Sequence, residues 1–225
     1  MLLEELRRHV LQVGLRMVED GVARGSQGNV SAIDSETGLI VITPSAIPYG
    51  KLQAEDICVV DREGKIVESK WKPTSEIALH LIFYQQRSDV KAVVHSHAPY
   101  STVFGVIYEP IPLVLAETAM ILNAPVPVAP YARPGTKEVA QVTFESMLPD
   151  KVAAVMAHHG LVTVGPNLEA AYESTIAVET TARIVMMAYS MGGTIHALDL
   201  QECRELRQIY LASYKAKSIQ PGGMQ

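Results

Sequence analysis

The chain has 225 residues, of which 48% are hydrophobic and 19% charged, and its formal net charge is −5. This length suits one domain over residues 1–225, and the low share of charged residues indicates burial on several sides, as in an oligomer. Composition and pattern predict no nucleic-acid footprint, membrane span or signal peptide, so we expect a cytoplasmic protein in which Cys58 and Cys203 are free thiols.

Helix and strand patterns alternate along the chain, which is typical of an α/β layered fold. We expect, in chain order, an amphipathic helix over 3–17, strands over 39–43 and 56–61, a helix opened by Pro73 and running to residue 86, a strand over 90–97, a short helix over 98–107, a helix over 137–148, strands over 152–159 and 161–164, and helices over 167–191 and 199–214. The segment RGSQGN, after the first helix, is predicted to be a loop.

Histidines give the sharpest local signal in the sequence. His95 and His97 end an apolar strand, and because residues two apart in a strand face the same side, their imidazoles would converge. His158 and His159 follow another apolar strand, and adjacent strand residues face opposite ways, so at most one of them easily joins the same site. The other is expected to be a hydrogen-bonded structural residue. Three imidazoles suit a catalytic Zn²⁺ site with an open position, or another divalent transition metal.

The remaining histidines lack a partner pattern. His9 and His80 are expected on helices, and neither they nor His196 belong to a metal-ligand spacing. A surface or packing role is the simpler interpretation for all three.

Three short polar segments could bind an anion. KPTSE (72–76) opens a predicted helix, where hydroxyls and free backbone N–H groups can either cap the helix or bind a phosphate. GSQGN (25–29) and TPSA (43–46) supply two further loops. Together with the histidines, they indicate an anionic substrate next to a metal.

These segments occur in the order and spacing of a known family. The segments are GSQGNVS, ITPSAIPYGKL, KPTSE, AVVHSHAPYST, VAPYARPGT and AHHGLV. They resemble the class II aldolase/adducin-like family over roughly residues 5–190, and the closest likeness is to its L-fuculose-1-phosphate aldolases. The resemblance implies a three-layer α/β/α sandwich around a central, mostly antiparallel sheet. It also implies a homotetramer with active sites at the subunit interfaces.

The resemblance assigns roles to individual residues. It implies that His95, His97 and His159 bind zinc, and that Glu76 is the catalytic acid/base and a further contact of the resting metal. Tyr214 is the best match to a catalytic tyrosine near the C-terminus. Phosphate binding is implied for Gly28, Asn29, Ser45, Ala46, Thr74 and Ser75.

The implied reaction is the reversible cleavage of a ketose 1-phosphate, of the L-fuculose 1-phosphate type, to dihydroxyacetone phosphate and a short aldehyde through a metal-stabilised enediolate. One departure concerns the aldehyde side, where Ala116 stands in place of a tyrosine that helps protonate the departing aldehyde, with Glu117 next. The aldehyde and the specificity therefore stay open.

Three other functions stay open on the same scaffold. An L-ribulose-5-phosphate 4-epimerase usually has Asp where this chain has Glu76, so the aldolase interpretation leads. A sugar-phosphate dehydratase or decarboxylase is a further alternative. A non-enzymatic scaffold like the adducin head would lack the metal ligands, and the three histidines argue against it.

Overall fold

The computed structural model describes residues 1–218, with side chains through Ser213, and builds them around one sheet of eight strands. The strand order is β4-β3-β2-β1-β5-β8-β7-β6, and every neighbouring pair is antiparallel except β6 and β7. The strands are β1 (Asn29–Ile33), β2 (Ile40–Ile42), β3 (Cys58–Val60), β4 (Ile66–Glu68), β5 (Ala92–Ser96), β6 (Val128–Ala129), β7 (Ala153–Met156) and β8 (Gly160–Gly165). The predicted, mostly antiparallel sheet is confirmed.

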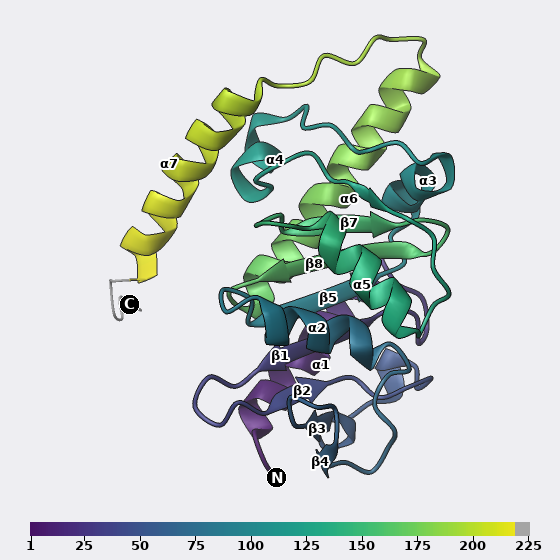
Figure 1. Cartoon of the computed structure of the whole chain (residues 1–225), viewed down its shortest axis with the longest axis vertical. Helices are drawn as coiled ribbons and strands as arrows, with labels where there is room; N and C mark the ends of the chain where they lie inside the picture. Colours follow the sequence, from purple (N-terminus) through teal and green to yellow (C-terminus); the bar gives the residue numbers. More distant parts are fainter. Residues whose placement is uncertain (219–225) are drawn as a thin grey trace.

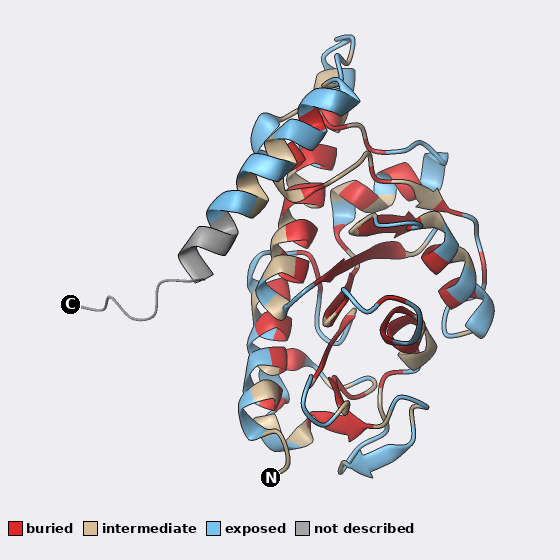
Figure 2. Ribbon diagram, turned by 60° about the vertical axis from the view of Figure 1, so that its left-hand side comes forward, coloured by how far each residue is buried: buried red, intermediate tan, exposed pale blue. Residues whose placement is uncertain are grey.

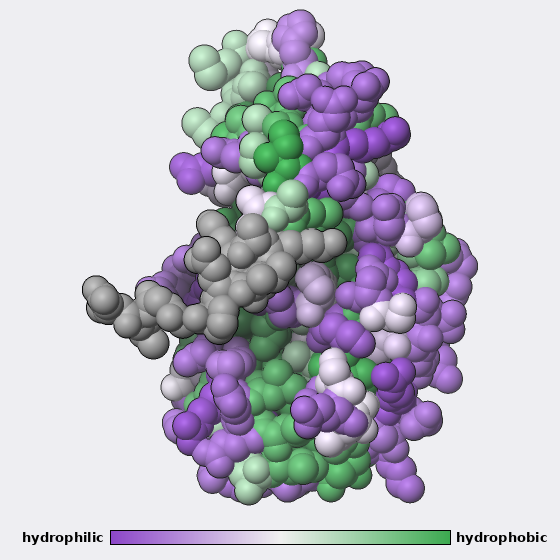
Figure 3. Space-filling view, turned by 90° about the vertical axis from the view of Figure 1, so that its left-hand side faces the viewer, coloured by the Kyte–Doolittle hydropathy of each residue, from purple (hydrophilic) through white to green (hydrophobic). Residues whose placement is uncertain are grey.

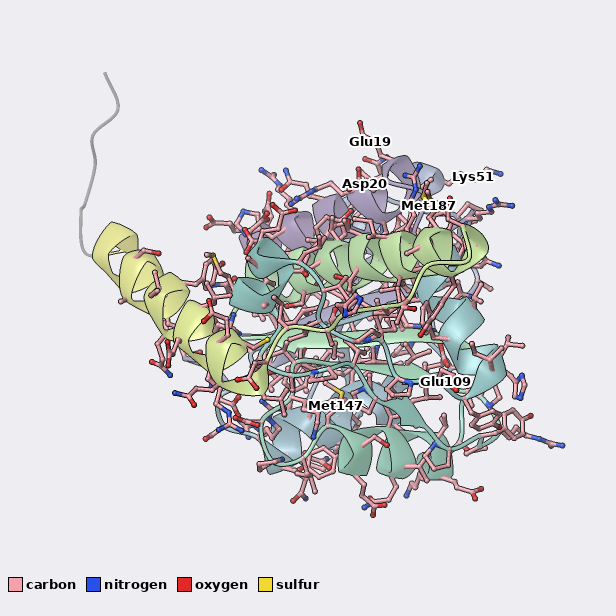
Figure 4. The ribbon with its side chains drawn as sticks, turned by 90° about the horizontal axis from the view of Figure 1, so that it is seen from above. Glu19, Asp20, Lys51, Glu109, Met147 and Met187 are labelled. Atoms are coloured by element: carbon pink, nitrogen blue, oxygen red, sulfur yellow. The ribbon has the colours of Figure 1, made fainter. Side chains whose placement is uncertain are left out.

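Helices cover both faces of this sheet, which gives three layers (Figures 1 and 2). The helices are α1 (Glu4–Glu19), α2 (Ile77–Gln86), α3 (Pro99–Ile107), α4 (Ala116–Ile121), α5 (Lys137–Ser146), α6 (Leu168–Ser190) and α7 (Leu200–Ser218), with 3-10 turns at Tyr49–Lys51 and Ala54–Asp56. Seen from above, α2 and α5 form one outer layer with Met147, and α6, which carries Met187, lies with α1 across the sheet from it (Figure 4). The α/β/α sandwich is therefore confirmed.

The alternation of side chains along the central strands builds a core on each face. On β5, Ala92 and Val94 belong to the core under α1 and α6, whereas Val93 belongs to the core under α2 and α5. All three are fully buried, which is why this strand is apolar on consecutive positions rather than on alternate ones. Helices therefore pack against both faces of β5, the strand that carries His95 near its end.

The predicted end of one strand and the predicted start of one helix are wrong. The strand expected over 152–159 ends at Met156, so His158 and His159 lie in the turn that follows it. The helix expected from Pro73 begins only at Ile77, because Pro73 lies in an isolated bridge with Pro44 and the Thr74 N–H donates to the Thr43 carbonyl at 3.1 Å. Pro73 and Thr74 are therefore paired with the residues that follow β2, and the chain then turns to enter α2. Three strands (β1, β4 and β6) and the short helix α4 were not predicted at all.

The second half of the chain adds long helices. The two helices predicted over 167–191 and 199–214 are confirmed as α6 and α7, and α7 extends to one side of the body (Figure 1). Seen from that side, apolar patches lie exposed between polar side chains (Figure 3). Within residues 1–218, no helix combines the length and the apolar character that crossing a membrane requires. Cys58 and Cys203 are free and buried.

Candidate metal centre and active site

Three histidines meet at one end of β5, as predicted. His95, His97 and His159 each offer one ligand atom, and these atoms lie within 4.8 Å of one another. Nε2 of His95 and Nε2 of His97 are 3.1 Å apart. The strand period brings the first two rings to the same side, and the β7–β8 turn brings the third.

The orientation of His95 is fixed by the neighbouring strand. Its Nδ1 lies 3.0 Å from the carbonyl oxygen of Leu161 on β8, and a carbonyl can only accept a hydrogen bond, so Nδ1 carries the proton. This leaves Nε2 to face the other two histidines. A backbone carbonyl that orients a metal-ligating imidazole in this way is a common second contact in metal sites.

The other two histidines are held in the neutral form. Burial lowers the pKa of His97 to about 4, with further lowering by the nearby His95 and His159. Burial and then His95 likewise lower the pKa of His159 to about 4. Neutral imidazoles are the form that binds a metal ion.

Gly160 allows the β7–β8 turn to approach the metal-binding strand. A Cβ at this position would lie 2.4 Å from the Ser96 carbonyl oxygen and 3.1 Å from Cε1 of His95. The preceding His158 adopts a left-handed conformation with φ of 55°, which turns its side chain away from that of His159. The expectation of an inward-facing and an outward-facing histidine is therefore confirmed.

The surroundings of His158 differ from the prediction. The expected role was that of a hydrogen-bonded structural residue, whereas His158 is exposed. Its ring contacts those of Tyr108 and Tyr131 edge-on, at centroid distances of 5.4 and 6.0 Å.

Glu76 places its carboxylate against the histidine cluster. Oε2 lies 3.2 Å from Nε2 of His95, and Oε1 lies 3.3 Å from Nε2 of His159. Burial acts to raise the pKa of Glu76, but the interactions of its carboxylate with His95, the Asn29 amide and His159 outweigh burial and hold the pKa well below its usual value. The carboxylate is therefore ionised at neutral pH.

The donor set fits a divalent metal ion. Within the described residues, Oε1 of Glu76 and Nδ1 of His159 are buried atoms without a hydrogen-bond partner. Buried polar atoms are normally paired, so unpaired ones next to a cluster of neutral imidazoles indicate a missing partner. Three imidazole nitrogens and one carboxylate are the ligand types that Zn²⁺ prefers.

The GSQGN loop ends against the metal centre. Gly28 has φ of +74°, and a Cβ there would lie 2.5 Å from the His95 carbonyl oxygen, so glycine is required. Asn29 follows as the first residue of β1 and is only 4% exposed. Its amide Nδ2 donates to Oε2 of Glu76 at 2.9 Å, which places this predicted phosphate residue beside the carboxylate.

The other two predicted anion segments lie side by side. The Ser45 N–H donates to the Lys72 carbonyl at 2.9 Å, which joins the TPSA loop to the KPTSE segment. Ser45 is half-buried, and Ala46 is exposed with φ of 60°, a conformation that favours glycine. The three segments thus meet at one edge of the sheet.

Within KPTSE, the two hydroxyls have different surroundings. Thr74 is buried and its Oγ1 accepts the Glu76 N–H at 3.2 Å, so this hydroxyl holds the turn before α2. Ser75 is exposed, and the carbonyl of Ser75 lies 3.4 Å from the Cβ position of Gly135. The PYARPGT loop therefore closes over the same segment.

Two further candidates lie away from this cluster. Ala116 is the exposed first residue of α4. Tyr214 belongs to α7, but its side chain lies outside the described residues. His80 contacts the site although its position in the sequence gives no such signal. It is completely buried, and its Nε2 lies 2.5 Å from Oδ1 of Asn29.

A groove of about 1210 Å³ lies on another part of the molecule, along α1 and the Ile33–Glu36 turn. None of the three histidines nor Glu76 lines it. The candidate metal ligands and the ionised carboxylate lie at the histidine cluster and not at this groove.

The fold and the metal centre agree with the comparisons with known families. Residues 8–186 match the family described as Class II Aldolase and Adducin N-terminal domain. The chain belongs to this family, and its relatives of known name make it an enzyme of the class II aldolase type, a lyase. Class II aldolases depend on a metal ion.

Two relatives and two solved structures illustrate the similarity. The chain is 34% identical over 192 residues to 5-deoxy-D-ribulose 1-phosphate aldolase of Bacillus thuringiensis serovar kurstaki, covering 85% of this chain and 89% of the relative. It is 33% identical over 198 residues to L-fuculose phosphate aldolase of Escherichia coli K12, covering 88% and 90%.

A solved L-fuculose 1-phosphate aldolase superposes with a TM-score of 0.87 at 32% identity, covering 92% of this chain and 96% of that one. YgbL of Klebsiella pneumoniae, described as a candidate aldolase/epimerase/decarboxylase, gives 0.82 at 32% identity, covering 92% and 100%.

Proposed function

We propose that this chain is a zinc-dependent aldolase that reversibly cleaves a ketose 1-phosphate, of the L-fuculose 1-phosphate type, to dihydroxyacetone phosphate and a short aldehyde. The observation that carries the proposal is the carboxylate of Glu76, 3.2 Å from His95 and 3.3 Å from His159. Two relatives at about one-third identity are named as aldolases of phosphorylated sugars. The metal ligands are His95, His97 and His159, with Glu76 as a further contact.

The chemistry divides between the metal site and the carboxylate. When bound, a divalent metal ion supplies a Lewis acid that stabilises negative charge on the ketone-derived fragment. Glu76 is ionised and buried next to that site, so it can act as a base. In the direction of condensation Glu76 removes a proton from the carbon next to the carbonyl of dihydroxyacetone phosphate, and in cleavage it returns this proton.

The phosphate is assigned to the edge where the three polar segments meet. Gly28 and Asn29 contribute one segment, and Ser45 with Ala46 contributes the second. Thr74 and Ser75 contribute the third. The exposed hydroxyl of Ser75 and the half-buried hydroxyl of Ser45 are available to a ligand, so a phosphate there would hold the reacting carbon beside Glu76.

We also infer a homotetramer with active sites near the subunit interfaces. Large apolar side chains are exposed at the ends of two neighbouring helices, α3 and α6: Val103, Val106, Ile107, Tyr108, Ile184, Met187, Tyr189 and Met191. Such a surface is typical of subunit contacts. Light scattering at micromolar concentration tests the assembly, and a monomer would refute it.

Tyr214 is assigned to the active site of a neighbouring subunit. Mixing inactive Glu76→Gln chains with inactive Tyr214→Phe chains tests this assignment after subunit exchange. Partial recovery of activity is expected, because some interfaces then combine two intact partners. No recovery despite proven exchange would exclude a shared site.

A substrate panel tests the reaction itself. The metal-loaded protein is assayed with dihydroxyacetone phosphate and lactaldehyde, glycolaldehyde or acetaldehyde, and in the reverse direction with ketose 1-phosphates and their unphosphorylated forms. Aldol products, and kcat/KM values far higher for the phosphorylated sugars, are expected. Epimerised, dehydrated or decarboxylated products without cleavage would contradict the proposal. Comparable kcat/KM values on unphosphorylated sugars would refute the assignment of a phosphate-binding site.

A further inference from the structure

Four buried polar side chains form a series that begins at the carboxylate of Glu76. Each is at most 4% exposed: Asn29, Ser31, His80 and Tyr84. They join in a continuous series of hydrogen bonds that runs from the carboxylate into the core between β1 and α2, where α2 lies over the sheet (Figure 1). Burying four polar groups is costly unless all are paired, and here each one is.

The spacing of the residues explains why they meet. Asn29 and Ser31 are two apart on β1 and face the same side, separated by roughly 6.7 Å along the strand. Glu76, His80 and Tyr84 recur every four residues at the start and along one side of α2, separated by about 6.0 Å per step. The two spacings nearly match, so strand and helix side chains alternate in one series.

The chemistry of Glu76 sets the direction of every bond. An ionised carboxylate only accepts, so the Asn29 amide must present its N–H to Oε2 at 2.9 Å and its carbonyl Oδ1 to the other side. Oδ1 lies 2.5 Å from Nε2 of His80, which must therefore donate. Nδ1 of the neutral ring then accepts from the Ser31 hydroxyl at 2.7 Å, and Ser31 accepts from the Tyr84 hydroxyl at 2.6 Å.

Burial keeps His80 in the neutral form that this pattern needs. Complete burial, and then the nearby His95, lower the pKa of His80 to about 3, although Glu76 acts in the opposite direction. A neutral imidazole carries one proton, and only the tautomer with that proton on Nε2 satisfies both neighbours.

We propose that His80 is a positioning residue that fixes the Asn29 amide, so that Asn29 donates to Oε2 of Glu76 and turns Oε1 toward His159 and the substrate. This inference rests on the proposed role of Glu76 as the base. Oε2 is held by Asn29, so Oε1, 3.3 Å from Nε2 of His159, is the oxygen that takes the proton when substrate is bound. Without the N–H of His80, the amide could flip and direct its carbonyl at the carboxylate.

The series orients the base but does not carry protons. A proton passing from Glu76 to His80 would have to cross the Asn29 amide, which neither accepts nor releases a proton readily at neutral pH. The consequence for catalysis is therefore geometric, and it concerns the turnover step rather than substrate binding.

The tautomer of His80 gives a test that does not depend on activity. ¹⁵N NMR of the imidazoles in the metal-loaded protein near pH 7 should show His80 neutral, with its proton on Nε2. Tyr84→Phe should leave this signal in place, because the bond to Asn29 remains. A proton on Nδ1, or a charged ring, would overturn the proposal.

Kinetics of two variants test the consequence. His80→Leu should lower kcat roughly 10- to 100-fold, as the loss of an outer hydrogen-bond partner commonly does, with unchanged KM and metal content. His80→Gln, which restores an N–H donor at the same depth, should recover most of that loss. Leu79→Ala is the matched control, since this neighbouring buried residue of α2 should lower stability while kcat stays unchanged.

The outcomes separate this inference from the proposed function. Full kcat in His80→Leu with an active wild type would overturn the positioning role and leave the aldolase reaction standing. Equal loss in His80→Leu and His80→Gln, or in Leu79→Ala, would also overturn it, because the effect would then follow packing. A wild type without aldolase activity but with the Nε2 tautomer would refute the reaction and support the hydrogen-bond series.

Discussion

Asn29 on β1 and His95 on β5 are direct partners in the antiparallel register of the sheet. Asn29 donates to Glu76 and His95 belongs to the metal centre, so the strand pairing itself sets the position of the base relative to the metal. The register of a buried sheet is strongly specified. A shift of β1 by one residue relative to β5 would turn Asn29 to the opposite face, away from Glu76, and dismantle the site.

The metal centre predicts one divalent ion per chain. His95→Ala and His159→Ala should each lose most of the bound metal, because each removes one of three imidazoles whose ligand atoms lie within 4.8 Å. His158→Ala is the matched control and should retain metal, since its ring lies against Tyr108 instead. Elemental analysis after dialysis measures this, and full metal retention in His95→Ala and His159→Ala would refute the assignment.

Gly160 gives a prediction about the scaffold of the site. Gly160→Ala should destabilise the fold by about 1–3 kcal/mol and weaken metal binding, because the new Cβ would meet the Ser96 backbone oxygen at 2.4 Å. Gly50→Ala is the control, since nothing lies within 4 Å of its Cβ position. Urea unfolding measures the stability of each variant, and metal titration measures its metal affinity. Equal stability and equal affinity in the two variants would show that the turn accommodates a Cβ at residue 160.

His80 should make the metal-free protein sensitive to acid. Its pKa is about 3 when folded and about 6.5 when unfolded, so the unfolded chain takes up the proton first. This contribution to stability is complete above pH 6.5 and is lost as the pH falls toward 3, by up to about 1.4 kcal/mol per pH unit. His80→Gln lacks it.

The comparison of the two proteins isolates this effect from other acid-sensitive groups. Urea unfolding between pH 7 and 4 should show the wild type losing stability more steeply than His80→Gln. Glu76 and His95 face the same region and are present in both proteins, so their contributions to the pH dependence largely cancel. Parallel curves would mean that His80 is protonated equally easily in the folded and unfolded chains.

Much of the metal centre could be read from sequence because it follows the strand period. His95 and His97 are two apart at the end of an apolar strand, and this spacing alone predicts rings on the same side. His159 could be chosen over His158 only through the family resemblance. The left-handed φ of His158 is the physical reason that its side chain faces outward while that of His159 faces the metal centre.

Other features could not be predicted because the sequence gives them no local signal. β1 begins directly after the glycine-containing loop. It is fully buried, but its polar residues Asn29 and Ser31 interrupt the apolar run that would predict a buried strand. The helix start was placed too early because Thr74 is equally suited to a helix cap, whereas here it holds a turn. His80 is a lone histidine in sequence, and only its spacing of four from Glu76 points to a shared helix side.

The central claim is that Glu76 is the catalytic base beside a metal centre, and Glu76→Gln tests it most directly. The amide keeps the size of the side chain but cannot accept the proton, so kcat should fall by about 10²–10⁴. The exposed Glu63→Gln serves as the control and should retain full activity. We predict this loss of turnover in a Glu76→Gln protein that is folded and still binds metal, and near-normal turnover in that same metal-loaded variant would contradict the account.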